Sequence, residues 1–228
     1  MKRFLLIDLD DTILDFSKSE NTAVKLALNE LGLYSNDEVA SWYKRFNIEV
    51  WKDFEKGLIT RENLGKLRFV RLLEKMGEDI SLGDKLNNTY CSLLAYQHFM
   101  IDGAREFLVK IAAYYRIIGV SNGTSKVQWQ RIKDSGLNEL TESIFVSEDI
   151  GIQKPKKEYF EYVAAHVDGF EKEQAVIVGD SLTSDISGGK NYGITTVWYN
   201  PENESSNLPD YVVKNFDELY DLLISLNS

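Results

Sequence analysis

The chain has 228 residues, of which 43% are hydrophobic and 27% are charged. This composition is typical of a globular protein with one large domain, or with a core domain that carries a smaller insertion, and it excludes collagen-like, disordered and membrane-embedded classes. The 36 acidic residues outnumber the 26 lysines and arginines, giving a formal net charge of −10. Because duplex binding needs clustered basic residues and none are visible, nucleic acid is not expected as a partner.

The apolar runs, the cysteine and the histidines further limit the kinds of protein and of metal site that the sequence allows. The first apolar run, residues 4–7, is cut by Asp8, which is far short of the roughly 20 residues of a membrane span and too short for a signal peptide. We therefore expect a cytoplasmic protein with no membrane partner. Cys91 is the single cysteine, so no internal disulfide or Cys-rich zinc site is expected. His98 and His166 are the only histidines, and each is expected to be a surface or packing residue.

The predicted elements begin with a buried strand over residues 4–9, followed by helices from residue 17 to about 98 with no convincing strand. Ser17 to Glu20 has the form of a capping box, and Asn36 and Thr60 are expected to cap the second and third helices.

From residue 102 onward, helices and strands alternate. Helices are predicted over 103–114, 125–135, 157–167 and 183–191, each followed by a short apolar strand, and the last strand, 211–213, precedes a final helix from about residue 216. Such alternation is typical of βαβ units and a parallel sheet. The predicted fold is therefore an α/β sheet domain, interrupted after its first strand by an all-helical insertion.

Polar side chains follow four of the predicted strands, and in such sheets ligands bind at the carboxyl ends of the strands. Taken singly, an aspartate at a strand end, a serine before a helix or a lone lysine is ordinarily a turn, cap or surface residue. Together at one sheet edge, they indicate a phosphate and metal site. These residues are Asp8, Asp10, Ser121, Lys154, Asp180 and Asp185.

The chemistry of phosphate transfer explains this set. A carboxylate such as Asp8 can attack phosphorus and form an aspartyl phosphate, but two like charges about 4 Å apart repel by about 4 kcal/mol at an effective dielectric near 20. Mg²⁺ held by Asp8 and Asp180, together with Lys154, would cancel this repulsion. Asp10, two residues after Asp8, can point to the same side and serve as a general acid and base.

The sequence resembles the haloacid dehalogenase-like (HAD) hydrolase superfamily over essentially its whole length. The four motifs that carry the resemblance are Asp8-x-Asp10-x-Thr12, Ser121, Lys154 with Pro155, and Gly179-Asp180 with Asp185. It implies a Rossmann-like catalytic core of residues 1–15 and 99–228, with helices on both faces of the sheet, and a type-one helical cap of residues 16–98.

The resemblance also implies a role for each motif residue. Asp8 is expected to be the nucleophile and Asp10 the general acid and base. The remaining roles are phosphate binding by Thr12, Ser121, Asn122 and Lys154, Mg²⁺ binding by Asp8, Asp10 and Asp180, and support of the metal by Asp185.

Within the superfamily, Trp51, residues 54–63, residues 179–189 and residues 198–200 resemble the pyrimidine 5′-nucleotidases. This implies a Mg²⁺-dependent phosphatase, monomeric or homodimeric, that acts on a small phosphate ester such as a pyrimidine nucleoside monophosphate. Phe16 and Trp51 are the predicted apolar contacts for the base, although cap aromatics more often form a helix-packing core.

Alternatives remain open at this stage. A phosphatase or phosphomutase for small sugar phosphates or phosphoglycolate shares all four motifs and would differ in its cap. A true dehalogenase would need neither Asp10 nor the metal. A receiver-like signalling domain also accepts phosphate on aspartate, but it would not need a helical insertion of this size.

Overall fold

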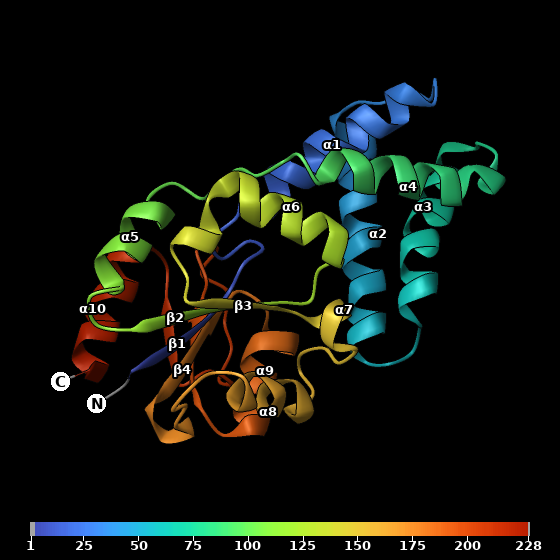
Figure 1. Ribbon diagram of the computed structural model, residues 1–228. Helices are drawn as coiled ribbons and strands as arrows, with labels where there is room; N and C mark the ends of the chain where they lie inside the picture. The colour runs from blue at the N-terminus through green and yellow to red at the C-terminus, as the bar shows by residue number, and fades with distance from the viewer. Residues whose placement is uncertain (1–2, 228) are drawn as a thin grey trace. The chain divides into compact units, whose positions relative to one another are not determined.

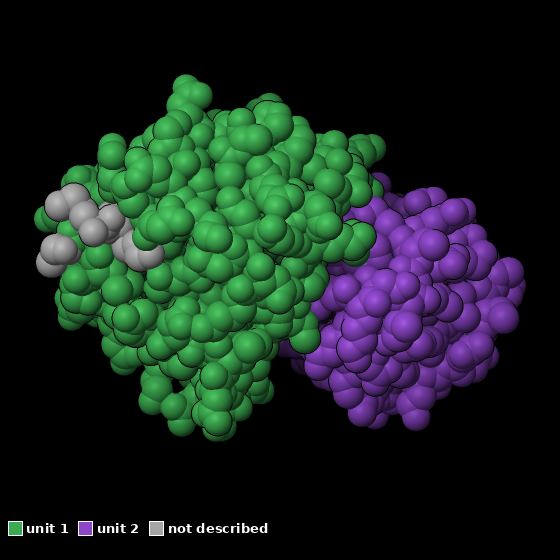
Figure 2. Space-filling view, turned by 90° about the horizontal axis from the view of Figure 1, so that it is seen from below, with its two compact units in different colours: residues 1–15, 100–228 green, residues 16–99 purple. Residues whose placement is uncertain are grey.

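The computed structural model describes residues 3–227, which divide into two compact units. Unit 1 combines the residues up to Asp15 with those from Met100 onward, and unit 2 is Phe16–Phe99 (Figure 2). Among the described residues, no helix is both long enough and apolar enough to cross a membrane.

Unit 1 is built on a six-stranded sheet in which every neighbouring pair of strands is parallel. Strands β1 to β4 are labelled in Figure 1. The strand order is β3-β2-β1-β4-β5-β6, which places β1 between β2 and β4. This confirms the predicted α/β class with a parallel sheet. The strands are β1 Phe4–Asp8, β2 Arg116–Ser121, β3 Ser143–Val146, β4 Ala175–Gly179, β5 Thr195–Tyr199 and β6 Tyr211–Val213.

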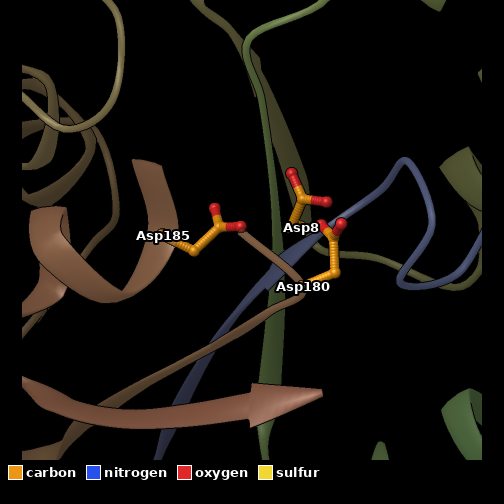
Figure 3. A group of neighbouring side chains, drawn as sticks. All are labelled: Asp8, Asp180 and Asp185. Carbon is orange, nitrogen blue, oxygen red and sulfur yellow. The ribbon is translucent and has the colours of Figure 1, made fainter. Parts of the chain in front are cut away.

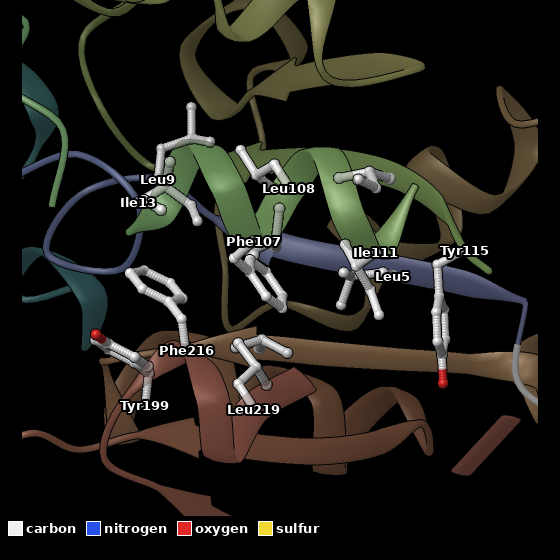
Figure 4. Packing of buried hydrophobic residues seen from close by; sticks show 14 of the residues in the cluster. Leu5, Leu9, Ile13, Phe107, Leu108, Ile111, Tyr115, Tyr199, Phe216 and Leu219 are labelled. Atoms are coloured by element: carbon white, nitrogen blue, oxygen red, sulfur yellow. The ribbon is translucent and has the colours of Figure 1, made fainter. Parts of the chain in front are cut away.

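Both faces of the sheet are covered because alternate residues of a strand point to opposite sides. Leu5 and Ile7 of β1 join one buried cluster with helices α5 (Ala104–Ile111) and α10 (Phe216–Asn227), as Figure 4 shows in part. Phe4 and Leu6 join a second cluster with α8 (Lys157–Ala165). A strand buried on both faces reads as a continuous apolar run, which is why β1 was predictable.

Other elements of unit 1 depart from the predicted ones in detail. The predicted helix over 183–191 is a π-helical turn, Leu182–Ile186, followed by α9, Ser187–Tyr192. A short helix α7, Ser147–Ile150, follows β3 and was not predicted. Helix α6, Ser125–Ser135, has the predicted bounds. Single 3₁₀ turns are formed by Leu137–Glu139 and Lys172–Gln174.

Unit 2 is all-helical over its described length. Its elements are α1 Phe16–Glu30, α2 Asp37–Glu55, α3 Arg61–Met76, a 3₁₀ turn Ile80–Leu82 and α4 Gly83–Leu94. The predicted caps of α2 and α3 are confirmed, since the side chains of Asn36 and Thr60 accept backbone hydrogen bonds from Val39 and Asn63. The sequence predicted Ser17 as the cap of the first helix, but helix α1 begins one residue earlier, at Phe16, so Ser17 lies inside the helix.

The interior of unit 2 combines stacked aromatic rings with a buried polar network. Tyr43 lies 4.8 Å from Phe69 and 5.3 Å from Tyr90, measured between ring centroids. The guanidinium of buried Arg68 donates to Asn47 at 3.1 Å, and Asn47 in turn donates to Glu20 at 2.6 Å. These long-range hydrogen bonds connect α1, α2 and α3 through buried polar side chains, which are ordinarily hydrogen bonded in folded proteins.

Candidate active site

A buried lysine connects two aspartates at the carboxyl edge of the sheet. Lys154 is 1% exposed, and its Nζ lies 2.6 Å from Asp8 Oδ1, 2.7 Å from Asp185 Oδ1 and 3.1 Å from the carbonyl oxygen of Val120. Burial opposes the charge of Lys154, but the carboxylates of Asp185 and Asp8 outweigh it and raise its pKa above the ordinary value. Lys154 is therefore a fixed cation beside Asp8.

Three carboxylates meet at this point, as Figure 3 shows. One oxygen each of Asp8, Asp180 and Asp185 can be chosen so that all lie within 4.8 Å of one another. Burial raises the pKa of Asp8 to about 8; the charge of Asp185 adds to the shift and that of Lys154 opposes it. Burial, followed by the charge of Asp8, also raises the pKa of Asp180 well above its usual range. Ionising all three carboxylates is costly unless a further cation joins them.

The donor set fits Mg²⁺. Three ionised carboxylates against one ammonium leave two negative charges uncompensated, which the two positive charges of a divalent cation would neutralise. Oxygen ligands from carboxylates are those that Mg²⁺ prefers, with water and substrate phosphate completing its coordination. The residues that would hold the ion are Asp8 and Asp180, with Asp185 close enough to take part directly or to support them.

Thr12 and Trp198 hold Asp8 and Asp180 in place by hydrogen bonds. The buried hydroxyl of Thr12 donates to Asp8 Oδ2 at 3.2 Å and accepts from the backbone N–H of Asp180 at 3.1 Å. The indole of Trp198 on β5 donates to the carbonyl oxygen of Asp180 at 2.7 Å. Thr12 thus connects the ends of β1 and β4. Its predicted contact with phosphate stays a prediction.

Asp185 reaches the cluster because the π-helical turn folds back over a glycine. A Cβ atom at Gly179 would lie 2.3 Å from Asp185 Cγ, so the last residue of β4 must lack a side chain. The second oxygen of Asp185 accepts from the backbone N–H of Ser181 at 3.2 Å. The fully buried Asp185 therefore has partners on both oxygens.

Ser121 is the last residue of β2, and Asn122 follows it beside Lys154. Ser121 Oγ accepts from the backbone N–H of Gly123 at 3.0 Å, and it is almost fully buried. The side chain of Asn122 accepts from the backbone N–H of Lys154 and donates to its carbonyl oxygen, both at 2.9 Å. Asn122 thus fixes the backbone of Lys154. Phosphate binding by Asn122 and Ser121 stays a prediction.

Asp10 is held by two residues that the sequence analysis missed. Its Oδ1 accepts from Arg131 and its Oδ2 from Gln128, both of which lie on α6. The available signal was a glutamine and an arginine at i and i+3, which share one face of a helix, directly after the loop that carries Ser121. A polar pair on a helix ordinarily faces solvent, so the spacing alone did not mark them.

The two predicted base contacts lie in unit 2. Trp51 is partly buried in a cluster with Val50, Phe54 and Leu64, and its ring meets the ring of Phe54 edge-on at 5.7 Å. Phe16 is the first residue of α1 and is half-buried. Their contact with a substrate stays a prediction. Both histidines are exposed, as expected, and the ring of His166 stacks on Tyr162.

A buried aspartate, a candidate metal cluster and a buried lysine at the carboxyl edge of a parallel sheet are the arrangement expected of a hydrolase of this kind. In agreement with this, the profile of the haloacid dehalogenase-like hydrolase family matches residues 5–199. The chain belongs to that family and is a HAD-type hydrolase.

The similar proteins agree with this assignment. The chain is 39% identical to the HAD-hydrolase YfnB of Bacillus subtilis, over 98% of this chain and 97% of that protein. It is 36% identical to the pyrimidine 5′-nucleotidase PynA of Streptococcus pneumoniae, over 97% and 94% of the two chains. It is also 27% identical to the pyrimidine 5′-nucleotidase YjjG of Escherichia coli, over 96% and 97%.

Among solved structures, YfnB of Bacillus subtilis bound to magnesium superposes with a TM-score of 0.92 at 38% identity, covering 97% of this chain and 98% of that one. That structure is described as revealing interdomain movement.

Proposed function

We propose that the protein is a Mg²⁺-dependent phosphomonoesterase that works through an aspartyl phosphate on Asp8 and acts on pyrimidine nucleoside 5′-monophosphates. The observation that carries the proposal is the convergence of Asp8, Asp180 and Asp185 around Lys154 at the end of β1. A phosphate group brought to this point would meet a carboxylate nucleophile, a fixed cation and a second carboxyl group, Asp10.

The proposed reaction has two steps. In the first, an oxygen of Asp8 bonds to phosphorus while the bond from phosphorus to the ester oxygen breaks, and Asp10 gives its proton to that oxygen. In the second step, the oxygen of a water molecule bonds to phosphorus while Asp10 accepts a proton from that water. The bond between Asp8 and phosphorus then breaks, which releases inorganic phosphate and restores both carboxyl groups.

Charge compensation is the main task of the surrounding residues. When bound, Mg²⁺ would supply positive charge at the phosphate oxygens and keep Asp8 ionised. Lys154 adds a second cation that is fixed by its bonds to Asp8 and Asp185. The hydroxyl of Ser121 and the backbone N–H groups at the start of α6 can donate to phosphate oxygens.

The pyrimidine nucleotide substrate class is supported by the similarity to PynA and YjjG, which are named as pyrimidine 5′-nucleotidases. We propose that unit 1 carries the chemistry and that unit 2 is a cap that opens for substrate and closes to exclude water. The interdomain movement described for YfnB supports that role.

A phosphate-release screen tests the proposal. Purified protein is given pyrimidine and purine nucleoside 5′-monophosphates, sugar phosphates and phosphoglycolate, with Mg²⁺ or with EDTA. We expect the highest kcat/KM on pyrimidine nucleotides and no turnover in EDTA. A preference for sugar phosphates or phosphoglycolate would contradict the substrate class while leaving the phosphatase intact.

The Asp8→Asn variant tests whether Asp8 is the nucleophile. It keeps the side-chain volume but replaces the carboxylate by an amide, which is a far weaker nucleophile, so turnover should fall by at least about 1,000-fold while the fold is unchanged. Mass spectrometry of acid-quenched wild type should show one added phosphoryl group, and the variant should show none. Substantial turnover by a purified Asp8→Asn protein would refute the covalent mechanism.

A further inference from the structure

Helix α6 holds both oxygens of the Asp10 carboxylate. Arg131 Nη1 lies 2.5 Å from Asp10 Oδ1, and Gln128 Nε2 lies 2.9 Å from Asp10 Oδ2. Arg131 also donates to Gln128 Oε1 at 2.7 Å, which fixes which way the amide of Gln128 points. The second N–H of that amide donates to Ser121 Oγ at 2.9 Å.

This arrangement is built deeply into unit 1. Gln128 is 1% exposed and Arg131 is 0% exposed, whereas the Asp10 side chain that they hold is 26% exposed. Burying a guanidinium is costly unless it is paired and hydrogen bonded. The backbone also makes room for the contact, because a Cβ atom at Gly123 would lie 2.4 Å from Gln128 Cγ.

The geometry suits a group that must hold its direction while it exchanges a proton. Asp10 follows β1 in a loop, and without partners its carboxyl group could rotate away from the reacting oxygen. Each carboxylate oxygen has two acceptor positions, so one bond from α6 leaves a position free for the proton. Because the amide of Gln128 donates to both Asp10 and Ser121, it fixes the position of Asp10 relative to a hydroxyl that is predicted to bind phosphate.

We propose that Gln128 and Arg131 are positioning residues that orient Asp10 for proton transfer to the leaving oxygen and from water. This inference rests on the proposed phosphatase function. It predicts that their loss matters most when the leaving group needs a proton. An alkoxide, such as the 5′-oxygen of a nucleoside, needs one, whereas 4-nitrophenolate leaves without it.

The test compares two substrates under single-turnover conditions with saturating Mg²⁺. The rate of release of nitrophenol from 4-nitrophenyl phosphate is measured beside that of uridine from uridine 5′-monophosphate. In Gln128→Met, which keeps the side-chain volume, and Arg131→Lys, which keeps the charge, uridine release should slow by about 100-fold. Nitrophenol release should slow by less than about 10-fold, because general acid catalysis contributes little there.

Gln130→Met and Lys133→Met, on the same helix, are the matched controls, and both rates should stay near those of the wild type. If Gln128→Met slows both substrates equally, or slows neither, the positioning role is overturned. Circular dichroism and thermal unfolding report whether each variant folds. If Arg131→Lys does not fold, the two rates of Gln128→Met alone test the positioning role. Failure of the wild type to release phosphate from either substrate would instead contradict the proposed function.

Discussion

At the scale of single residues, Lys154 is the cation that pairs with the carboxylates of the site. Its ammonium is buried and contacts two of the three clustered carboxylates. Removing one partner from a buried ionic group typically costs about 3–5 kcal/mol, because the remaining charges are left uncompensated. Lys154 should therefore matter for stability as well as for turnover.

We predict that Lys154→Met, which keeps the side-chain length, unfolds in EDTA with a free energy lower than that of the wild type by about 3 kcal/mol. Mg²⁺ should restore more stability to the variant than to the wild type, because its site is more negative. Urea unfolding with and without Mg²⁺ measures both effects. Lys156→Met, at an exposed neighbouring position, should resemble the wild type, and equal stability of Lys154→Met and wild type in EDTA would contradict the prediction.

The residues that were predictable from the sequence share one property: their position at a strand end. Asp8, Ser121 and Asp180 follow apolar runs whose parallel arrangement was predictable, so their convergence followed from topology. Gln128 and Arg131 differ because they reach the site from the side of a helix. Whether a helical glutamine faces solvent or the interior depends on tertiary packing, which the amphipathic pattern of α6 did not reveal.

At the scale of elements, the parallel sheet and the approximate helix positions could be predicted because strand and helix periods are distinct, whereas the order of the strands was not predicted. The π-helical turn, Leu182–Ile186, could not be predicted. Its residues read locally as an ordinary helix start, and the wider turn depends on Asp185 reaching over Gly179 to Lys154. Such a departure at a ligand-binding edge is a common place for local patterns to fail.

Asp210 connects β5 to the segment that leads into β6. Its Oδ2 accepts from the backbone N–H and the hydroxyl of Thr196, both at 2.9 Å, and its Oδ1 accepts from Lys190. Partial burial disfavours the charge of Asp210, but the hydrogen bonds from Lys190 and Thr196 outweigh it and hold its pKa below the ordinary value. The ionised carboxylate is therefore favoured in the folded state.

A lowered folded-state pKa gives stability that is complete above the unfolded-state pKa and lost as the pH falls through the folded-state pKa. We predict that Asp210→Asn costs about 1 kcal/mol at pH 7, a value discounted for the partial exposure of the pair. The cost should shrink below about pH 4, near the ordinary pKa of aspartate. Urea unfolding at pH 7 and at lower pH measures this; a cost that does not change with pH would contradict it. Asp221→Asn, at an exposed position of α10, is the control.

At the scale of the whole molecule, the net charge of −10 and the carboxylate cluster act in the same direction. Both disfavour the compact state through repulsion between like charges. A divalent cation at the cluster would relieve the strongest local part of this repulsion. The metal proposed for chemistry should then also be a determinant of folding stability.

We predict that Mg²⁺ at about 100 times its dissociation constant stabilises the protein by about 2.7 kcal/mol, which for a chain of this size raises Tm by roughly 5–10 °C. Differential scanning calorimetry in Mg²⁺ and in EDTA, at matched ionic strength, measures the shift. Asp180→Asn should melt higher than the wild type in EDTA, because a like charge is gone, and should gain much less from Mg²⁺. An equal Mg²⁺ shift in wild type and Asp180→Asn would place the ion elsewhere and remove the basis for the proposed metal site.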